Sequence, residues 1–419
     1  MMMSMYSAVS GLKSQQTKLN VIGNNISNIN TVGYKSQKVG FSDLLSQNIS
    51  SASGASGNMG GTNAKQIGLG TQVSSIEMTM NPGSSQYTGN DTDVALGGEG
   101  FFIVQGSTPE DRKYTRAGNF GVDTAGNLVV NGMKVCGYEP GATKLTALNI
   151  FDETPGDGKK YNLAQQKTSK ASLMGNLDSS KSTVASPTAV TSTMTVYDSL
   201  GVSHEVALTF TNTPATQSWT VTGTIDGTGT VTPTPATVTF NAAGTMTAPA
   251  APLHTLSLSV PITGGATTPQ TVTVGMSGIT GAASATGTSS VRVADIDGYA
   301  SGTLKDFSIG ADGVITGSYS NGQKKSVGQL VVATFNNPAG LEKIGDNLYD
   351  RTMNSGEPAP ETPGSGQAAK LTTGALEMSN VDLANEFSEM MITQRAYQAN
   401  SKIITTSDTL METLINMSR

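Results

Sequence analysis

Residues 381–419 read VDLANEFSEMMITQRAYQANSKIITTSDTLMETLINMSR, and their apolar spacing sets the architecture of the chain ends. Apolar side chains recur every seven residues, as in a helix that packs along a partner helix. That row is Leu383, Met390, Tyr397, Ile404 and Met411, with Phe387, Leu414 and Ile415 beside it. Ser379 and Asn380 offer a helix cap, and Asp382 is an acid of the kind favoured in a first helical turn. We therefore expect a helix from about residue 380 to residue 417.

A second helical pattern lies at the start of the chain, in residues 4–30. Its seven-residue row is Met5, Leu12, Leu19 and Ile26, and Ala8, Ile22 and Ile29 lie three positions after members of that row. The same stretch contains Gly11, Gly23 and several asparagines, and a glycine costs a helix about 1 kcal/mol relative to alanine. We expect this helix to be unstable alone.

The two ends also differ in charge. Residues 1–42 contain four lysines and no acid, whereas residues 377–419 contain six acids and three basic residues. Opposite charges favour pairing of the two segments. The alternative is that these charges form the solvated faces of two separate helices, because exposed ion pairs contribute only about 0–1 kcal/mol.

Between the two ends, the pattern changes to short strands and turns. Residues 46–66 are rich in Gly, Ser and Asn and predict a linker or an extended arm. From residue 71 onward, β-branched and aromatic runs alternate with turn sequences, which predicts β-sheet. Residues 211–290 contain a single formally charged side chain, Asp226, so the middle of the chain differs from its flanks. Just before that stretch, apolar residues alternate with smaller or more polar ones, which predicts a strand with one buried face: Val206, Leu208 and Phe210.

We therefore predict a mainly β protein with α-helical termini, in which N- and C-terminal helices pair as a coiled coil and carry two nested all-β domains. The predicted segments are a terminal helical coiled-coil domain (1–30 with 376–419), an extended connecting arm (31–70), an outer β-domain (71–144 with 297–375) and an inserted β-domain (145–296). Nesting of this kind places the two ends of the chain together.

The composition argues against an enzyme, a nucleic-acid-binding protein and a membrane-inserted protein. Charged residues make up 13% of the chain and the net charge is −6, so no basic surface for nucleic acid is expected. The chain has no apolar run of about 18 residues, and its first residues lack the pattern of a secretory signal. Cys136, His204 and His254 do not have the spacing of a zinc site or a catalytic centre. We expect no enzyme activity, no cofactor and no metal.

Motifs at both ends resemble the rod and hook axial proteins of the bacterial flagellum. They are GNNISNINTVGYK at residues 23–35, LEMSNVDLANEF at 376–387 and QRAYQANSK at 394–402. The motif residues carried over from this resemblance are Asn24, Asn25, Asn28, Thr31, Gly33, Tyr34, Asn380, Val381, Asp382, Gln394 and Arg395. ALGGEGFFIV at 95–104 and YTRAGNFGVDTAGNL at 114–128 are similar to further motifs of the same family.

The resemblance implies a structural protein that polymerises into a helical tube. Its terminal helices would form a coiled coil along a central channel, and its outer β-domains would form a flexible wall that transmits torque. The interface residues expected from the two apolar patterns are Met5, Leu12, Leu19, Ile22, Ile26, Ile29, Leu383, Phe387, Met390, Tyr397, Ile404, Met411 and Leu414. Ordering roughly 65 terminal residues costs on the order of 100 kcal/mol, so we expect both ends to be disordered in the monomer and to fold on polymerisation.

The resemblance also implies partners and a location. The partners are further copies of the chain, the distal rod protein, the hook cap, the hook–filament junction proteins and the flagellar type III export apparatus. That apparatus would deliver the chain to the extracellular flagellum without a cleaved signal peptide.

The sequence is compatible with three functional interpretations. The inserted β-domain favours a hook subunit that acts as a universal joint, because a distal rod protein would leave residues 145–296 unexplained. The distal rod protein is the alternative within the family. A secreted β-domain enzyme or carbohydrate-binding adhesin is the alternative outside it, and it predicts clustered carboxylates or aromatics in that domain, whereas the chain has one tryptophan, Trp219.

Overall fold

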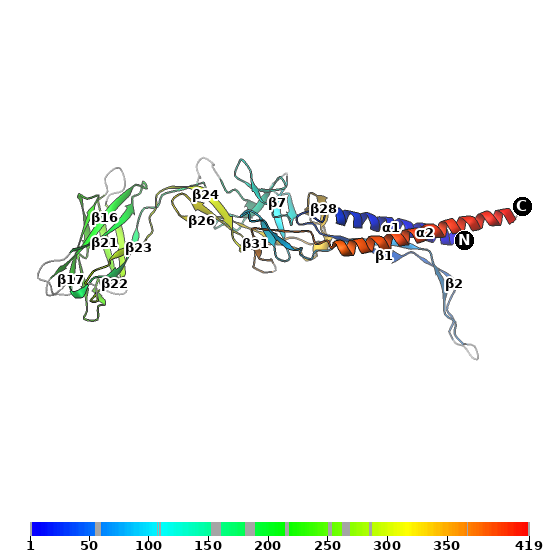
Figure 1. Ribbon diagram of the computed structural model, residues 1–419, viewed down its shortest axis with the longest axis horizontal. Helices are drawn as coiled ribbons and strands as arrows, with labels where there is room; N and C mark the ends of the chain where they lie inside the picture. The colour runs from blue at the N-terminus through cyan, green and yellow to red at the C-terminus, as the bar shows by residue number, and fades with distance from the viewer. Residues whose placement is uncertain are drawn as a thin grey trace. The chain divides into compact units, whose positions relative to one another are not determined.

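The computed structural model describes residues 2–54, 60–106, 108, 110–151, 161–180, 189–213, 218–249, 254–261, 269–284, 287–366 and 368–417. The described part is mainly β-sheet, with a long helix near each end and the two helices in contact (Figure 1). This confirms the predicted fold class. The chain divides into two compact units, Met1–Asp152 with Phe307–Gly317 and Lys325–Arg419, and Glu153–Asp306 with Ser318–Lys324. The segment boundaries drawn from the sequence stay a prediction.

The two terminal helices run antiparallel, side by side (Figure 1). Helix α1 spans Met2–Ser27 and helix α2 spans Leu383–Met417. Three contacts fix their direction: Asn25 with Glu386, Lys18 with Glu389, and Gly11 with Asn400. Within the described residues, neither helix is long and apolar enough to span a membrane.

The start of α2 differs from the expected one. Asp382 caps the helix in place of Ser379 or Asn380, because its Oδ1 accepts hydrogen bonds from the N–H groups of Ala384 at 2.9 Å and Asn385 at 3.4 Å. The Asn380 side chain instead binds the backbone of segments far earlier in the chain.

Four strands follow α1. They are β1 (Gln37–Asp43), β2 (Ser46–Ser50), β3 (Lys65–Gly68) and β4 (Thr71–Met78). β1 pairs with β4 and β2 pairs with β3, both antiparallel. The sequence did not predict β2 and β3, because all their residues are exposed and no alternating apolar pattern marks them. The β1–β4 pair lies against α1, where the Ser14 hydroxyl donates a hydrogen bond to the Thr71 carbonyl at 3.3 Å.

The first unit also contains a sheet whose strands pair in the order β26-β11-β7-β8-β29-β28, with β9, β10, β12, β27 and β30 attached to it. The bounds are β7 Phe101–Gln105, β8 Arg112–Thr115, β9 Gly121–Val122, β10 Leu128–Val130, β11 Met133–Tyr138, β12 Leu145–Ala147, β26 Lys324–Leu330, β27 Val332–Thr334, β28 Glu342–Gly345, β29 Leu348–Asp350 and β30 Ala359–Glu361. Its core includes Phe101, Tyr114, Phe335 and Tyr349. Their rings meet edge to face at centroid distances of 4.8 to 5.8 Å, the favoured geometry for aromatic pairs.

Two short strand pairs bring the C-terminal part of the chain back to its first quarter. β31 (Leu371–Thr373) pairs with β6 (Val94–Leu96), and β32 (Ala375–Glu377) pairs with β5 (Ser85–Tyr87). The last residue of β32 is therefore surrounded by segments that come from the N-terminal third of the sequence.

The second unit is built on a sheet in the order β15-β16-β17-β18-β21-β22-β14-β23, with β19 and β20 attached. The bounds are β14 Lys170–Asn176, β15 Ala189–Tyr197, β16 Ser203–Thr213, β17 Ser218–Ile225, β18 Gly229–Thr234, β19 Thr237–Phe240, β20 Met246–Ala248, β21 Thr255–Val260, β22 Gln270–Thr280 and β23 Arg292–Ile296. Of the other elements, β13 (Asn162–Leu163) belongs to the second unit, and β24 (Gly302–Ile309) and β25 (Val314–Tyr319) have residues in both units. The 3-10 helix Pro338–Gly340 belongs to the first unit. The expected strand is confirmed: Val206, Leu208 and Phe210 alternate inward on β16 and pack in one core with Trp219 of β17.

Candidate functional site

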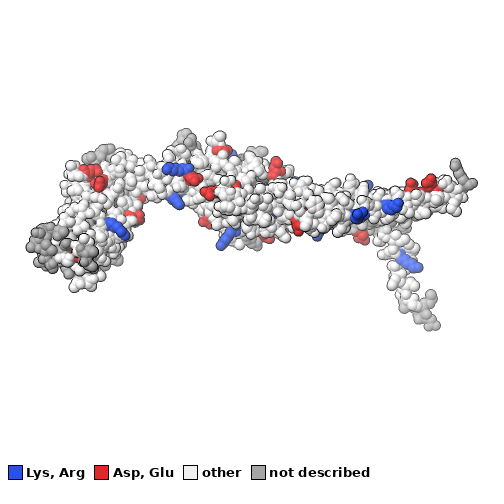
Figure 2. Space-filling model, viewed as in Figure 1, with Lys and Arg blue, Asp and Glu red and all other residues white. Residues whose placement is uncertain are grey.

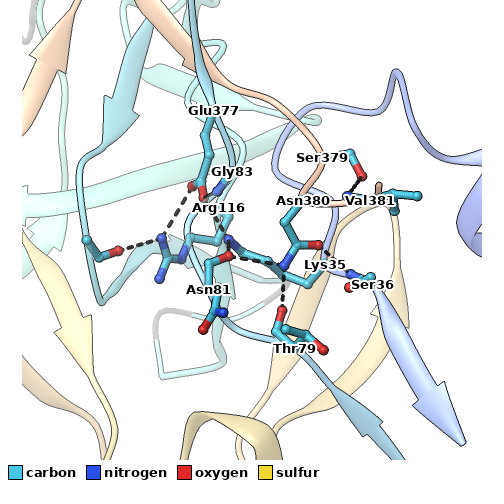
Figure 3. Close-up of polar contacts among 11 residues, drawn as sticks. Lys35, Ser36, Thr79, Asn81, Gly83, Arg116, Glu377, Ser379, Asn380 and Val381 are labelled. Carbon is cyan, nitrogen blue, oxygen red and sulfur yellow. Dashed lines mark hydrogen bonds and ion pairs between the residues drawn. The ribbon is translucent and has the colours of Figure 1, made fainter. Parts of the chain in front are cut away.

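The two ends of the chain meet at a buried cluster of charges (Figure 3). Glu377, the last residue of β32, is 1% exposed. Its Oε1 accepts hydrogen bonds from Lys35 Nζ at 2.6 Å and from the Gly83 N–H at 3.0 Å. Its Oε2 accepts one from Arg116 Nη1 at 3.3 Å. A single carboxylate therefore compensates two buried cations, each from a different part of the sequence.

The two cations make further contacts that hold the cluster together. Lys35 Nζ donates to the Asn81 carbonyl at 2.9 Å, and Arg116 Nη1 donates to the Gly98 carbonyl at 2.7 Å. The guanidinium of Arg116 also lies 5.0 Å from the centre of the Phe101 ring, which joins the cluster to the aromatic core. Burial, and secondarily the charge of Arg116, lower the pKa of Lys35, although Glu377 acts in the opposite direction.

Asn380 binds two segments beside this cluster (Figure 3). Its Oδ1 accepts a hydrogen bond from the Ser36 N–H at 2.8 Å, just before β1. Its Nδ2 donates to the carbonyls of Thr79 at 2.8 Å and Asn81 at 3.1 Å, just after β4. The segment that leads into α2 is thus fixed to both strands of the β1–β4 pair.

Gly33 allows the N-terminal segment to approach the cluster closely. Its φ of +69° lies in the left-handed region, and its N–H donates to the Glu377 carbonyl at 2.8 Å. A Cβ at this position would lie 2.8 Å from the backbone carbonyl carbon of Arg116, so no other residue fits without a shift of the backbone.

Asn25 links the two helices to β1. This side chain is buried, and its Oδ1 accepts from the Gln37 N–H at 3.0 Å and from the Tyr34 hydroxyl at 3.3 Å. Its Nδ2 donates to the Gln37 carbonyl at 2.9 Å and to Glu386 Oε1 at 3.0 Å. Burial raises the pKa of Tyr34 and that of Glu386. Lys343 Nζ lies over the Tyr34 ring, 4.0 Å from its centre.

The remaining motif residues have more local roles. Asn28 and Thr31 hydrogen-bond to each other in the turn after α1, where Asn28 Nδ2 also binds the Asn24 carbonyl. Val381 is buried beside the helix cap. Gln394 and Arg395 are exposed on α2, away from the charged cluster.

The predicted helix-interface residues differ in their burial within one chain. Ile22 is buried, and the half-buried residues are Met5, Leu12, Leu19, Ile26, Ile29, Met390 and Ile404. The exposed ones are Leu383, Phe387, Tyr397, Met411 and Leu414. The buried residues of α2 are Thr393 and Ser407, which sequence reasoning missed. They share a seven-residue spacing with Asn400, whose Nδ2 would lie 2.7 Å from a Cβ on Gly11.

Sequence reasoning also did not select Lys35, Arg116 and Glu377, although all three lie in the motifs quoted above. Charged residues make up only 13% of the chain, yet each of these motifs contains one. That charge was the signal by which the sequence could have pointed to these residues.

Cys136, His204 and His254 were the candidates for reactive groups in the sequence. Burial raises the pKa of the Cys136 thiol to about 11, so it stays protonated and unreactive at neutral pH. His204 Nδ1 lies 2.8 Å from Asp226 Oδ2, and His254 Nδ1 lies 2.6 Å from the Pro249 carbonyl oxygen.

Replacing Glu377 by alanine should destabilise the first unit strongly, because Lys35 and Arg116 would keep buried charges without a counter-ion. The expected loss is about 3–5 kcal/mol, measured by urea unfolding followed by far-UV circular dichroism. Glu357→Ala is the matched control, because Glu357 pairs with Arg351 in an exposed position. An equal effect of the two substitutions would show that the buried cluster does not hold the chain ends together.

Four family models match successive parts of the chain. They are the flagella basal body rod protein model (residues 5–35), the flagellar hook protein FlgE/F/G D1 domain (95–150), the flagellar basal body protein FlaE D2 domain (162–299) and the flagellar basal body rod FlgEFG protein C-terminal model (372–417). The first, second and last of these contain Lys35, Arg116 and Glu377, respectively.

Full-length relatives agree with the family models. The flagellar hook protein FlgE of Treponema pallidum is 36% identical and that of Salmonella typhimurium 33% identical, with 100% and 99% of this chain and all of each relative aligned. The flagellar basal-body rod protein FlgG of Bacillus subtilis is 30% identical, with 100% of both chains aligned. Because hook proteins that are more than 30% identical align over their full length, the chain belongs to the flagellar hook protein family.

Proposed function

We propose that this chain is a structural subunit of the flagellar hook that assembles with copies of itself into a helical tube, and that its terminal helices make the inner contacts. The observation that carries this proposal is the apolar surface on both helices. Phe387, Ile392 and Leu414 of α2 are 49%, 68% and 48% exposed, and Tyr6 of α1 is 68% exposed. A large apolar side chain gains about 1.5–3 kcal/mol on full burial, so neighbouring copies would stabilise this surface by covering it.

The faces that the two helices turn to each other support the same proposal. Coiled coils are held by apolar rows, whereas the buried residues of α2 are the small and polar Thr393 and Ser407. Ordering the 26 residues of α1 and the 35 residues of α2 costs on the order of 100 kcal/mol before any contact is counted. The proposed consequence is that the helices form only when neighbouring copies cover the predicted interface residues.

Removing residues 1–30 and 380–419 should abolish tube formation by the purified protein. Electron microscopy and sedimentation of the full-length and shortened chains measure this directly. Unchanged fluorescence of Trp219 in the shortened chain is the control for an intact second unit. Tubes from the shortened chain would contradict the proposed role of the helices.

Strong hydrogen-exchange protection of residues 4–30 in the monomer would contradict folding on assembly.

The distal rod remains the second candidate, because the Bacillus subtilis rod relative aligns over its full length. The hook is favoured because the relatives of higher identity are hook proteins. As a hook subunit, the chain would pass through the flagellar type III export apparatus and contact the distal rod protein, the hook cap and the hook–filament junction proteins.

Immunogold labelling of detached hook–basal bodies tests this location. We expect label along the hook and none along the rod. Label confined to the rod would support the second candidate. Label that stays inside the cell in a motile strain would contradict export.

We further propose that the second unit lets the tube bend as a universal joint. Residues 211–290, most of which belong to its sheet, carry a single formal charge, Asp226, and that carboxylate is engaged by His204. A surface with few charges forms few ion pairs with its neighbours, so neighbouring subunits would slide at low cost.

The bending stiffness of isolated hooks should therefore change little with salt. Raising the ionic strength from about 0.01 M to about 1 M shortens the screening length from roughly 30 to 3 Å, which would weaken any contact made of ion pairs. The persistence length measured on electron micrographs at the two salt concentrations provides the comparison. A marked softening in high salt would show that ion pairs control bending.

A further inference from the structure

The charged cluster (Lys35, Arg116 and Glu377) holds more positive than negative charge. Lys35 and Arg116 are cations, Glu377 is an anion, and all three side chains are almost completely buried. Among the residues that the structure describes, Glu377 is the only carboxylate whose charge acts on the pKa of Lys35 or on that of Tyr349, a buried neighbour. The cluster therefore has a surplus of one positive charge, and a buried charge without a counter-ion is costly.

Two buried hydrogen-bond donors lie beside this surplus charge. The Nε of Arg116 and the hydroxyl oxygen of Tyr349 are buried, and neither has a hydrogen-bond partner within the described part of the chain. A guanidinium is always protonated, and burial raises the pKa of the Tyr349 hydroxyl, so both groups keep a proton to donate. A buried donor without a partner costs free energy, so two of them in one place indicate a bound acceptor.

The two donors lie on the same face of the first sheet. Tyr349 of β29 pairs directly with Tyr114 of β8, so their side chains share a face. Arg116 follows Tyr114 by two residues, and side chains two residues apart on an extended segment point the same way. Arg116 is therefore the diagonal neighbour of Tyr349, a distance that long side chains reach across.

The ring of Phe101 lies next to both donor side chains. Its centre is 5.0 Å from Cζ of Arg116 and 5.4 Å from the ring centre of Tyr349. Nη1 of Arg116 is already engaged by Glu377 and by the Gly98 carbonyl (Figure 3). The Nε is thus the part of the guanidinium that is left for a further acceptor.

We propose that Arg116 Nε and the Tyr349 hydroxyl donate to one small monovalent anion of the kind of chloride, which neutralises the surplus charge of the cluster. A water molecule would accept both hydrogen bonds but would leave the charge uncompensated, so charge balance favours an anion. A monatomic ion with a single charge matches both the two donors and the surplus of one.

This inference goes beyond the proposed function, because it concerns the fold of one copy and requires no contact between copies. The anion connects β29 to the end of β8 at the place where the two chain ends meet. An ion that binds the folded chain and not the unfolded one stabilises the folded chain as its concentration rises.

Urea unfolding of the monomeric full-length chain tests the site, with gluconate replaced stepwise by chloride at constant ionic strength. Far-UV circular dichroism follows both units, and Trp219 emission follows the second unit as an internal control. Well above the dissociation constant, tenfold more chloride should lower the unfolding constant of the first unit about tenfold and leave the second unit unchanged.

A general attraction of anions to the protein surface would not give this result. The net charge of the chain is −6, and the charged side chains on the face shown in Figure 2 are sparse and of both signs. Any effect of the salt exchange on the surface would also reach the second unit and change the Trp219 transition.

Three variants locate the ion. Tyr349→Phe removes one donor and keeps the ring, and Lys35→Met removes the surplus charge without removing a donor. Both should abolish the dependence on chloride. Tyr114→Phe is the matched control and should retain it, because Tyr114 belongs to the same aromatic core but its hydroxyl is not one of the buried unpaired groups of the described residues.

A crystal structure of the protein grown in bromide gives an independent result. We expect an anomalous difference peak within hydrogen-bond distance of Arg116 Nε and the Tyr349 hydroxyl. Density there without anomalous signal would identify a water molecule and overturn the proposal. An unfolding constant that is equal in gluconate and chloride would also overturn it, as would a chloride dependence that survives Tyr349→Phe.

Discussion

The carboxylate of Glu377 is the interaction on which the arrangement of the chain ends depends. It lies between Lys35 and Arg116, and all three side chains are almost completely buried. A buried charge is costly unless its partner stays in place, so the three segments that carry these residues are fixed relative to one another. Since α1 ends just before Lys35 and α2 starts just after Glu377, the antiparallel pairing of the helices follows from the position of this one cluster.

The same constraint explains why glycine and asparagine are needed at the junction. Gly33 passes so close to the backbone of Arg116 that a side chain would not fit. Asn25 and Asn380 each have a donor and an acceptor on one short side chain, and each binds backbone groups of another segment with both. The junction is therefore held by charges at its centre and by amide side chains around it.

The sequence was informative where the signal is local. The seven-residue rows predicted both helices, and the alternation at Val206, Leu208 and Phe210 predicted β16. The sequence could not show that residues 35, 116 and 377 meet, because that contact depends on strand pairing across more than half the chain. It also suggested the wrong cap for α2, since the capping propensity of Asn380 does not reveal that its side chain is already engaged elsewhere.

Trp219 gives the molecule an optical property that follows from its position. It is the single tryptophan of the chain, and it is buried in the core of the second unit, which also contains Phe210 and Leu208. Emission from an indole shifts to longer wavelength when water reaches it, so the tryptophan emission of this protein reports on the second unit alone. The terminal helices contribute no tryptophan signal, and their ordering would therefore be visible in circular dichroism while the tryptophan emission stays constant.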